Sequence, residues 1–323
     1  MHRDVRRAML VLAVGACALA GPREVRAASE PVERQVGEHR FTGVPGLPTP
    51  FNGTFVRAST GAATTLGLEV QYYNFEDPPE LIGTRENDLK FLVQEFEFQQ
   101  KLWSRGAIRL SASGSGRMGT DTATLLSEGI SGIAGWNIGG TYVLTEKEKF
   151  KMSLAADITG NSLTSISIGD FIQDVLANGL QDTTNSLVNT TSNKRYTAGI
   201  RTAWGKSPTF GYMLYGDLGA QEPYDPADDT NFYWQAGGVL SFDMREKWGP
   251  DLGFTLASSY RSRSSKNEDL GSGGINSSFT IAYTGRPDFN VGLQTVYQRL
   301  KQLEVDNRIG ALGFNFFLRY DFS

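Results

Sequence analysis

Apolar and polar residues alternate with a period of two along most of the chain after residue 63. Successive side chains of an extended strand point to opposite faces, so this pattern predicts strands with one apolar face and one polar face. Each of the twelve stretches is about as long as a tilted strand needs to be to cross a bilayer. They lie at 64–75, 89–102, 107–117, 132–145, 150–160, 194–205, 210–221, 231–243, 251–262, 275–284, 289–301 and 308–322.

Short and long connections alternate between these stretches. The short ones are 103–106, 146–149, 206–209, 245–250 and 285–288. The long ones are 76–88, 118–131, 161–193, 222–230 and 263–274, with 302–307 as a modest exception. Membrane barrels have short periplasmic turns and longer outside loops, so the alternation predicts both termini in the periplasm. The expected fold is all-β, a transmembrane antiparallel up-and-down β-barrel of about twelve strands, with about ten to fourteen compatible.

The last stretch of the chain carries a wholly apolar face. Its members are Leu312, Phe314, Phe316, Leu318, Tyr320 and Phe322. This pattern resembles the closing strand of Gram-negative outer-membrane β-barrel proteins of the porin-like kind. The resemblance implies a place in the cell outer membrane. It also implies that Phe316, Leu318, Tyr320 and Phe322 form a signal for the outer-membrane assembly machinery, and it points to no particular subfamily.

Residues 1–27 have the pattern of a secretory signal peptide. Arg3, Arg6 and Arg7 precede an apolar core at 8–20, which is too short to span a bilayer as a helix. The small residues around Ala27 suit cleavage at that point. Residues 14–17 also form a loose lipoprotein box, and in that alternative Cys17 becomes a lipidated first residue.

Cleavage after Ala27 changes the chemistry that the chain can offer. It removes five Arg, two acidic residues and the single Cys, so the net charge moves from −4 to −7 and no thiol remains. A slightly acidic chain without a basic cluster argues against nucleic acid as a partner. No later stretch approaches the roughly 18 apolar residues of a membrane-spanning helix, which argues against an inner-membrane protein.

Residues 28–63 precede the first convincing strand. They contain Pro31, Pro45, Pro48 and Pro50 with several Gly, and we expect a periplasmic N-terminal arm that is extended or loosely ordered. Residues 54–58 are compatible with a short strand, or with a segment that tucks into the barrel from below. The expected organisation is therefore a signal peptide at 1–27, an arm at 28–63 and a barrel at 64–323.

The longest connection, 161–193, contains the one helical pattern of the chain. Apolar residues recur there at helical spacing. They are Ile168, Phe171, Ile172, Val175, Leu176 and Leu180. Since an apolar helical face needs cover, we expect Phe171, Ile172, Val175 and Leu176 to constrict the barrel mouth. The alternatives are packing on neighbouring loops and contact with the outer leaflet.

The face opposite the apolar stripes is expected to line the lumen. Its candidate lining residues are Glu69, Glu95, Glu97, Arg109, Asp157, Arg195, Arg201 and Asp217, with Lys151, Asp243 and Arg319 on the same parity. Both signs of charge are present. Such charges either line water in a narrow polar channel or pair across the barrel and close it, and the sequence leaves both interpretations open.

Candidate catalytic chemistry is sparse. Barrel hydrolases resemble one another in their use of His, and the only His after the signal is His39, which lies outside the expected strands. The acidic cluster at 225–229 lacks the spacing of a Ca²⁺ loop, and Arg261, Arg263 and Lys266 are compatible with lipopolysaccharide phosphates. We therefore expect no catalytic, metal or cofactor site.

These patterns favour a pore or passive transporter for small polar solutes, surrounded by outer-membrane lipid and lipopolysaccharide. The alternative is a non-conducting surface barrel whose loops bind lipopolysaccharide or a protein partner. A barrel enzyme is the third and least favoured hypothesis.

Overall fold

The computed structural model describes residues 34–66, 69–73, 81–86, 89–119, 130–166, 188–222, 230–264, 272–301 and 308–322. Within these ranges, no helix is long and apolar enough to cross a membrane. The one helix of the described residues, α5 (Arg245–Trp248), is four residues long and lies in a turn.

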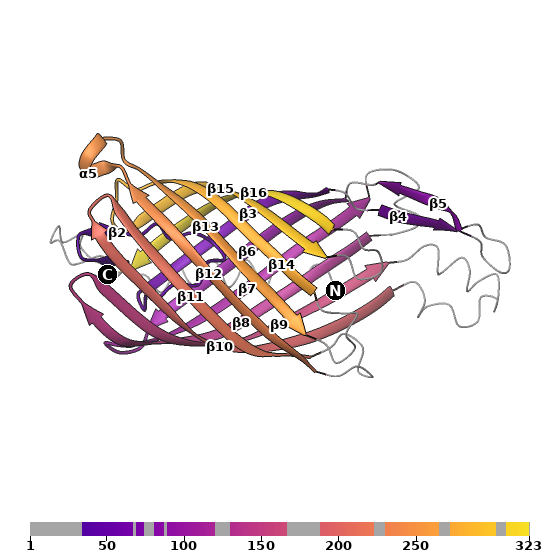
Figure 1. Cartoon of the computed structure of the whole chain (residues 1–323), viewed down its shortest axis with the longest axis horizontal. Helices are drawn as coiled ribbons and strands as arrows, with labels where there is room; N and C mark the ends of the chain where they lie inside the picture. Colours follow the sequence, from indigo (N-terminus) through magenta and orange to yellow (C-terminus); the bar gives the residue numbers. More distant parts are fainter. Residues whose placement is uncertain are drawn as a thin grey trace, which may run out of the picture. The chain divides into compact units, whose positions relative to one another are not determined.

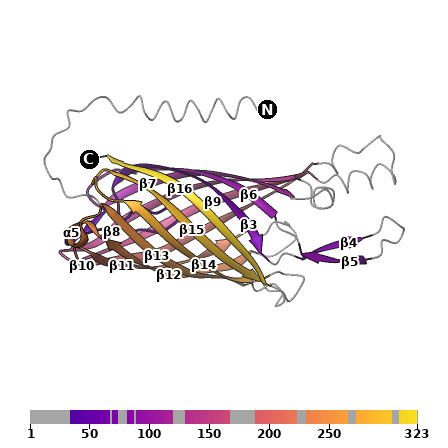
Figure 2. The ribbon, with the colours of Figure 1, turned by 90° about the horizontal axis from the view of Figure 1, so that it is seen from above.

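Twelve strands of this part of the chain close into an antiparallel barrel, and they run obliquely around it (Figures 1 and 2). They are β3 (Thr54–Leu66), β6 (Leu89–Lys101), β7 (Gly106–Gly119), β8 (Ile130–Lys147), β9 (Phe150–Ile166), β10 (Val188–Ser207), β11 (Phe210–Gln221), β12 (Asn231–Asp243), β13 (Leu252–Ser264), β14 (Ser272–Tyr283), β15 (Phe289–Lys301) and β16 (Arg308–Phe322). Each pairs with the next, and β16 closes the barrel against β3 from Phe322 opposite Thr54 to Gly310 opposite Leu66. The predicted twelve-stranded up-and-down barrel is confirmed.

The outer face of the barrel is an apolar belt. Leu293 and Phe314 point outward and are 65% and 60% exposed, whereas the inward-facing Phe317 is fully buried. Exposed apolar area on this scale needs lipid around it, because water would not tolerate it on a soluble monomer. The barrel therefore spans a membrane.

The first barrel strand begins ten residues earlier than the sequence pattern predicts. The wall starts at Thr54 in β3, and the predicted strand at 64–75 is wrong. The residues at 69–73 instead form β4 (Glu69–Tyr73), which pairs with β5 (Leu81–Glu86) in a separate two-stranded sheet. The predicted barrel boundary at 64 and the place of Glu69 on the lumen wall are corrected accordingly.

The longest connection is shorter than expected, because β9 continues to Ile166 and β10 begins at Val188. The predicted helix, with Phe171, Ile172, Val175 and Leu176, lies outside the described residues. It stays a prediction.

The five short connections lie at one end of the barrel, where β3 also begins and β16 ends. We call this the turn end and the opposite one the loop end. Residues 34–53, which we call the arm, enter the barrel interior at the turn end. The arm begins with a small hairpin of β1 (Gln35–Val36) and β2 (His39–Arg40), whose turn uses Gly37 at a φ of 60°.

The arm is the part of the chain that departs most from expectation. The segment expected to be loosely ordered is held against the inner wall, and Val36, Phe41, Val44 and Phe51 are each less than 5% exposed. Its prolines suit this position, because Pro carries no N–H that would need an acceptor inside the barrel.

Candidate functional site

An apolar cluster joins the arm to the wall. Val36, Phe41 and Phe51 of the arm pack against inward-facing side chains of β10 to β13, with Leu47 at the edge of the cluster. The wall residues are Ala203, Met213, Tyr215, Val239 and Ala257. Burying one Phe side chain contributes about 1.5–3 kcal/mol, so this contact alone favours a docked arm.

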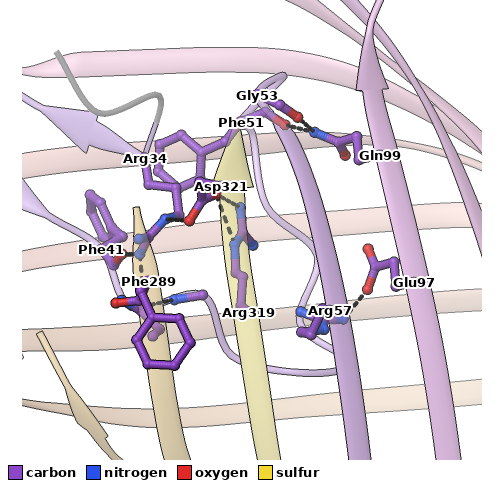
Figure 3. A network of polar contacts seen from close by, with 12 residues as sticks. Arg34, Phe41, Phe51, Gly53, Arg57, Glu97, Gln99, Phe289, Arg319 and Asp321 are labelled. Carbon is purple, nitrogen blue, oxygen red and sulfur yellow. Dashed lines mark hydrogen bonds and ion pairs between the residues drawn. The ribbon is translucent and has the colours of Figure 1, made fainter. Parts of the chain in front are cut away.

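Arg34 ties the start of the arm to the far wall (Figure 3). Its Nη1 donates to the Phe41 carbonyl at 2.6 Å and to Asn290 Oδ1 at 2.9 Å, and Nη2 donates to the Pro287 carbonyl at 3.1 Å. Its Nε lies 2.9 Å from an Asp321 carboxylate oxygen. Burial lowers the pKa of Arg34 to about 10, so the guanidinium remains charged at neutral pH.

Wall side chains also bind the backbone of the arm. Arg57 Nη1 donates to the Val44 carbonyl at 2.6 Å. Gln99 Nε2 donates to the carbonyls of Phe51 and Gly53 at 3.1 and 2.8 Å (Figure 3). A buried loop needs partners for its carbonyls, and these residues supply them. The arm is thus packed against and hydrogen-bonded to the inner wall of the barrel.

Above the arm, seven charged side chains form a continuous series of alternating sign, which we call the charge ladder. In order they are Glu95, Arg57, Glu97, Arg109, Asp157, Arg201 and Asp217, contributed by β3, β6, β7, β9, β10 and β11. Arg201 lies 2.7 Å from Asp157 and 3.8 Å from Asp217, while Arg109 contacts both Asp157 and Glu97. The alternation places each charge beside one of opposite sign, which offsets the cost of burial.

The ion pair between Arg109 and Asp157 spans β8, and it can form because β8 has a glycine between the two residues. Gly139 stands directly between Arg109 on β7 and Asp157 on β9 in the strand register. A Cβ at this position would overlap the Asp157 carboxylate. Glycine therefore leaves the space in which the two side chains meet across an intervening strand.

On β9 and β14, inward-facing side chains become more accessible from the turn end to the loop end, although Thr65 on β3 and Asn193 on β10 are buried near the loop end. On β9, Ser153 and Asp157 are buried, whereas Asn161 farther along the same face is partly exposed. On β14, Thr280 is buried and Asn276 is partly exposed. We call this accessible loop-end part of the interior the vestibule. Its polar lining includes Ser111, Ser113, Asn137, Asn161, Ser259 and Asn276.

A cleft of about 500 Å³ lies at the turn end, between the arm hairpin and two of the short turns. It is lined by Gln35–Glu38, Glu146–Lys149, Lys151 and Gly205–Ser207. The arm contributes Glu38 to its lining, and the two turns and β9 contribute the lysines and the other glutamates. Lys151 Nζ lies 3.1 Å from Glu146 Oε1. The cleft is polar and has no strong excess of either charge.

The predicted lining residues fall into three groups. Six of them, Glu95, Glu97, Arg109, Asp157, Arg201 and Asp217, come together in the charge ladder. Arg195 lies on the same inner face but outside the ladder, and its guanidinium stacks on Tyr233. Glu69 lies on β4, away from the barrel wall.

Sequence reasoning missed the residues that hold the arm, chiefly Arg34, Arg57 and Gln99. One signal was present: Phe41, Val44 and Phe51 give the arm more bulky apolar residues than a solvated leader needs. Among the described residues, no cluster of three or more His, Cys, Asp or Glu side chains is arranged to hold a metal ion.

No protein-family model and no curated protein sequence matches this chain. Among solved structures, the NanC porin is similar at 9% identity and a TM-score of 0.48, over 82% of this chain and all of the porin. An outer-membrane channel from Pseudomonas putida F1 is 14% identical with a TM-score of 0.48, over 87% and 100% of the two chains. The β domain of the Bordetella autotransporter BrkA is 9% identical, also at 0.48, over 84% and 100%.

Proposed function

We propose that the protein is an outer-membrane channel for small polar solutes, narrowed at its turn end by its own arm. The observation that carries this proposal is the change in accessibility along one face of the strands. Beside the arm the inner face is buried and carries both apolar and polar side chains, whereas most of the polar side chains that line the vestibule are partly exposed. Barrels of about eight strands are filled by side chains and those of about sixteen hold an aqueous channel, so twelve strands suit a narrow one.

The expected orientation follows from the connections. Short turns are periplasmic in barrels of this kind, so the arm would close the periplasmic half and the vestibule would face the outside. Outer-membrane lipid and lipopolysaccharide would surround the apolar belt. Phe316, Leu318, Tyr320 and Phe322 face outward on the closing strand, a position compatible with recognition by the assembly machinery.

A second candidate, the non-conducting surface barrel, is favoured by one observation. The arm and the charge ladder together fill the turn-end half of the interior with apolar contacts and ion pairs. In this reading the loops, rather than the lumen, carry the function, and they bind lipopolysaccharide or a protein. Nothing in the described residues calls for an enzyme.

Recording of current across a planar lipid bilayer distinguishes the channel from the non-conducting surface barrel. Protein refolded from the chain without residues 1–27 is added to the bilayer in KCl, with the heat-unfolded protein as the control. A channel gives discrete steps of current that the unfolded sample lacks. A folded barrel that stays electrically silent would overturn the channel and favour the surface barrel.

Acid should loosen the arm through His39. The imidazole is fully buried: Nδ1 lies 3.0 Å from the Pro208 carbonyl, which can only accept, so Nδ1 carries the proton and Nε2 accepts from Ser241 at 3.1 Å. Burial is the main cause that lowers the pKa of His39, and Arg40 lowers it further while Asp243 opposes the shift.

The docked arm therefore favours neutral His39. Its stabilisation is fully present above the free imidazole value of about 6.5 and is lost as the pH falls below it. We expect the conductance of the wild-type channel to rise between pH 7.5 and 5, and that of His39→Gln to change much less. An identical pH profile for the two proteins would rule out His39 as the responsible group.

A further inference from the structure

Arg195 differs from four other inward-facing arginines in that the described residues contain no close acidic partner for it. Arg57, Arg109, Arg201 and Arg319 each have a carboxylate oxygen within 4.0 Å. Among the described residues, no carboxylate oxygen lies that close to the Arg195 guanidinium. A charged group without a partner at the edge of an accessible space is suited to a charged ligand.

The Arg195 side chain is nevertheless held in place. Its guanidinium lies over the ring of Tyr233, 4.8 Å from the centroid, in a cation–π contact that restricts the motion of the group. The Tyr233 hydroxyl in turn donates to Gln235 Oε1. A guanidinium already ordered by an aromatic ring loses less conformational freedom when a ligand binds.

In the part of the chain that the structure describes, the N–H donors of Arg195 have no acceptor and are available to such a ligand. Its Nε is buried and has no hydrogen-bond partner in the described residues. The side chain as a whole is partly exposed, and its two terminal nitrogens donate to no acceptor of that part of the protein either. Two parallel N–H groups match the two oxygens of a carboxylate.

The surroundings add positive potential. Gln235 stands opposite Arg261 on β13 and opposite Asp217 on β11 in the strand register. The buried Asp217 lies 3.8 Å from Arg201, and the partly exposed Glu95 lies 3.7 Å from Arg57. Both acidic groups therefore have an arginine close by. Arg195 and Arg261 both act electrostatically on Tyr233, from β10 and β13, and Asp217 also interacts with Arg195 at longer range.

We propose that Arg195, backed by Tyr233 and Gln235, binds the carboxylate group of small anionic solutes in the vestibule. This inference rests on the proposed channel and deepens it, because it names the class of solute that the channel selects. Carboxylates would be concentrated at this site before they meet the narrower passage beside the arm.

The test uses benzoate as the probe and neutral benzamide as its matched comparison. Benzoate should reduce the current of the wild-type channel at concentrations at which benzamide has no effect. Loss of a charge-assisted hydrogen bond weakens binding by about tenfold or more, so Arg195→Gln should raise the half-blocking benzoate concentration by at least that factor. The same variant should lower the permeability to Cl⁻ relative to K⁺.

The matched control is Lys194→Gln. Lys194 is the residue before Arg195, so it lies on the opposite, exposed face of β10, and its substitution removes the same positive charge. It should leave the block by benzoate unchanged. Arg195→Lys keeps the charge without the planar fork, so it should retain ion selectivity and lose part of the block. Equal effects of the Gln variants at 194 and 195 would overturn the proposal, and so would a block that Arg195→Gln does not weaken.

The failure of the channel itself would look different. If the wild-type barrel carries no current, the proposed function fails, and the binding site is then tested by calorimetry on the refolded protein in detergent. Heat released with benzoate in the wild type, and lost in Arg195→Gln but not in Lys194→Gln, supports the site. Equal heats in the three proteins overturn it.

Discussion

A chain that begins at Thr54, and therefore lacks the arm, is expected to form a channel of several-fold higher conductance than the full-length protein. The reason is that the arm occupies the turn-end interior and contacts its walls from β3 round to β16, through Arg34, Val44 and Phe51 among others. The closing pair of β3 and β16 does not involve the arm, so the barrel should still close without it. Single-channel recording in a planar bilayer measures the difference.

Because the truncated barrel could refold poorly, a full-length variant provides a second test of the arm. Phe41→Asp places a charge in the apolar cluster, at a side chain that is 1% exposed, and this change should undock the arm. Substituting Glu38, a residue on the exposed turn of the arm hairpin, with Gln should change nothing. If both the truncated chain and Phe41→Asp conduct as the wild type does, the arm is not the constriction.

Breaking the charge ladder at its centre should destabilise the barrel strongly. Asp157 contacts Arg109 and Arg201, and Asp157→Asn leaves the buried guanidinium of Arg201 and the partly buried one of Arg109 with only their more distant partners. Removing one partner of a buried ion pair costs about 3 kcal/mol or more of unfolding free energy. Urea-induced unfolding of the barrel in lipid vesicles gives this difference.

An exposed ion pair of the same chain provides the comparison. Arg286 and Asp288 lie 2.6 Å apart in the turn between β14 and β15, with Arg286 60% exposed. Asp288→Asn should cost less than about 1 kcal/mol, because water screens the charges. Equal losses for the two Asp variants would show that the ladder contributes no more than a surface pair.

The glycine beneath the ladder gives an independent check on the same contact. Gly139→Ala should destabilise the barrel, because the added methyl group displaces the Asp157 carboxylate from Arg109. Gly140→Ala is the control: its Cβ would meet nothing closer than the Ala107 carbonyl at 3.8 Å, which is an ordinary contact. If both substitutions are tolerated alike, Asp157 does not depend on the space at Gly139.

The alternation of side chains along each strand was enough to predict most of the wall. Parity is a local property of an extended chain, so the stretches at 210–221, 231–243 and 289–301 coincide with β11, β12 and β15. The inward parity of Asp157 and Arg201 follows from the same rule. The alternation did not reveal the first strand, β3, because Ala, Thr and Gly dominate residues 58–65 and the apolar and polar positions there barely differ in hydrophobicity.

Only the tertiary structure decided which inward residues meet. Arg34 contacts Asn290, 256 residues away, and Arg109 reaches Asp157 past a strand that contributes only a glycine at the crossing. No local pattern encodes such pairs, because closing the barrel brings strands from the whole chain around one interior. The arm illustrates the same point. Its prolines and glycines predict a chain without regular structure, and its burial depends on a wall built from residues 55 to 321.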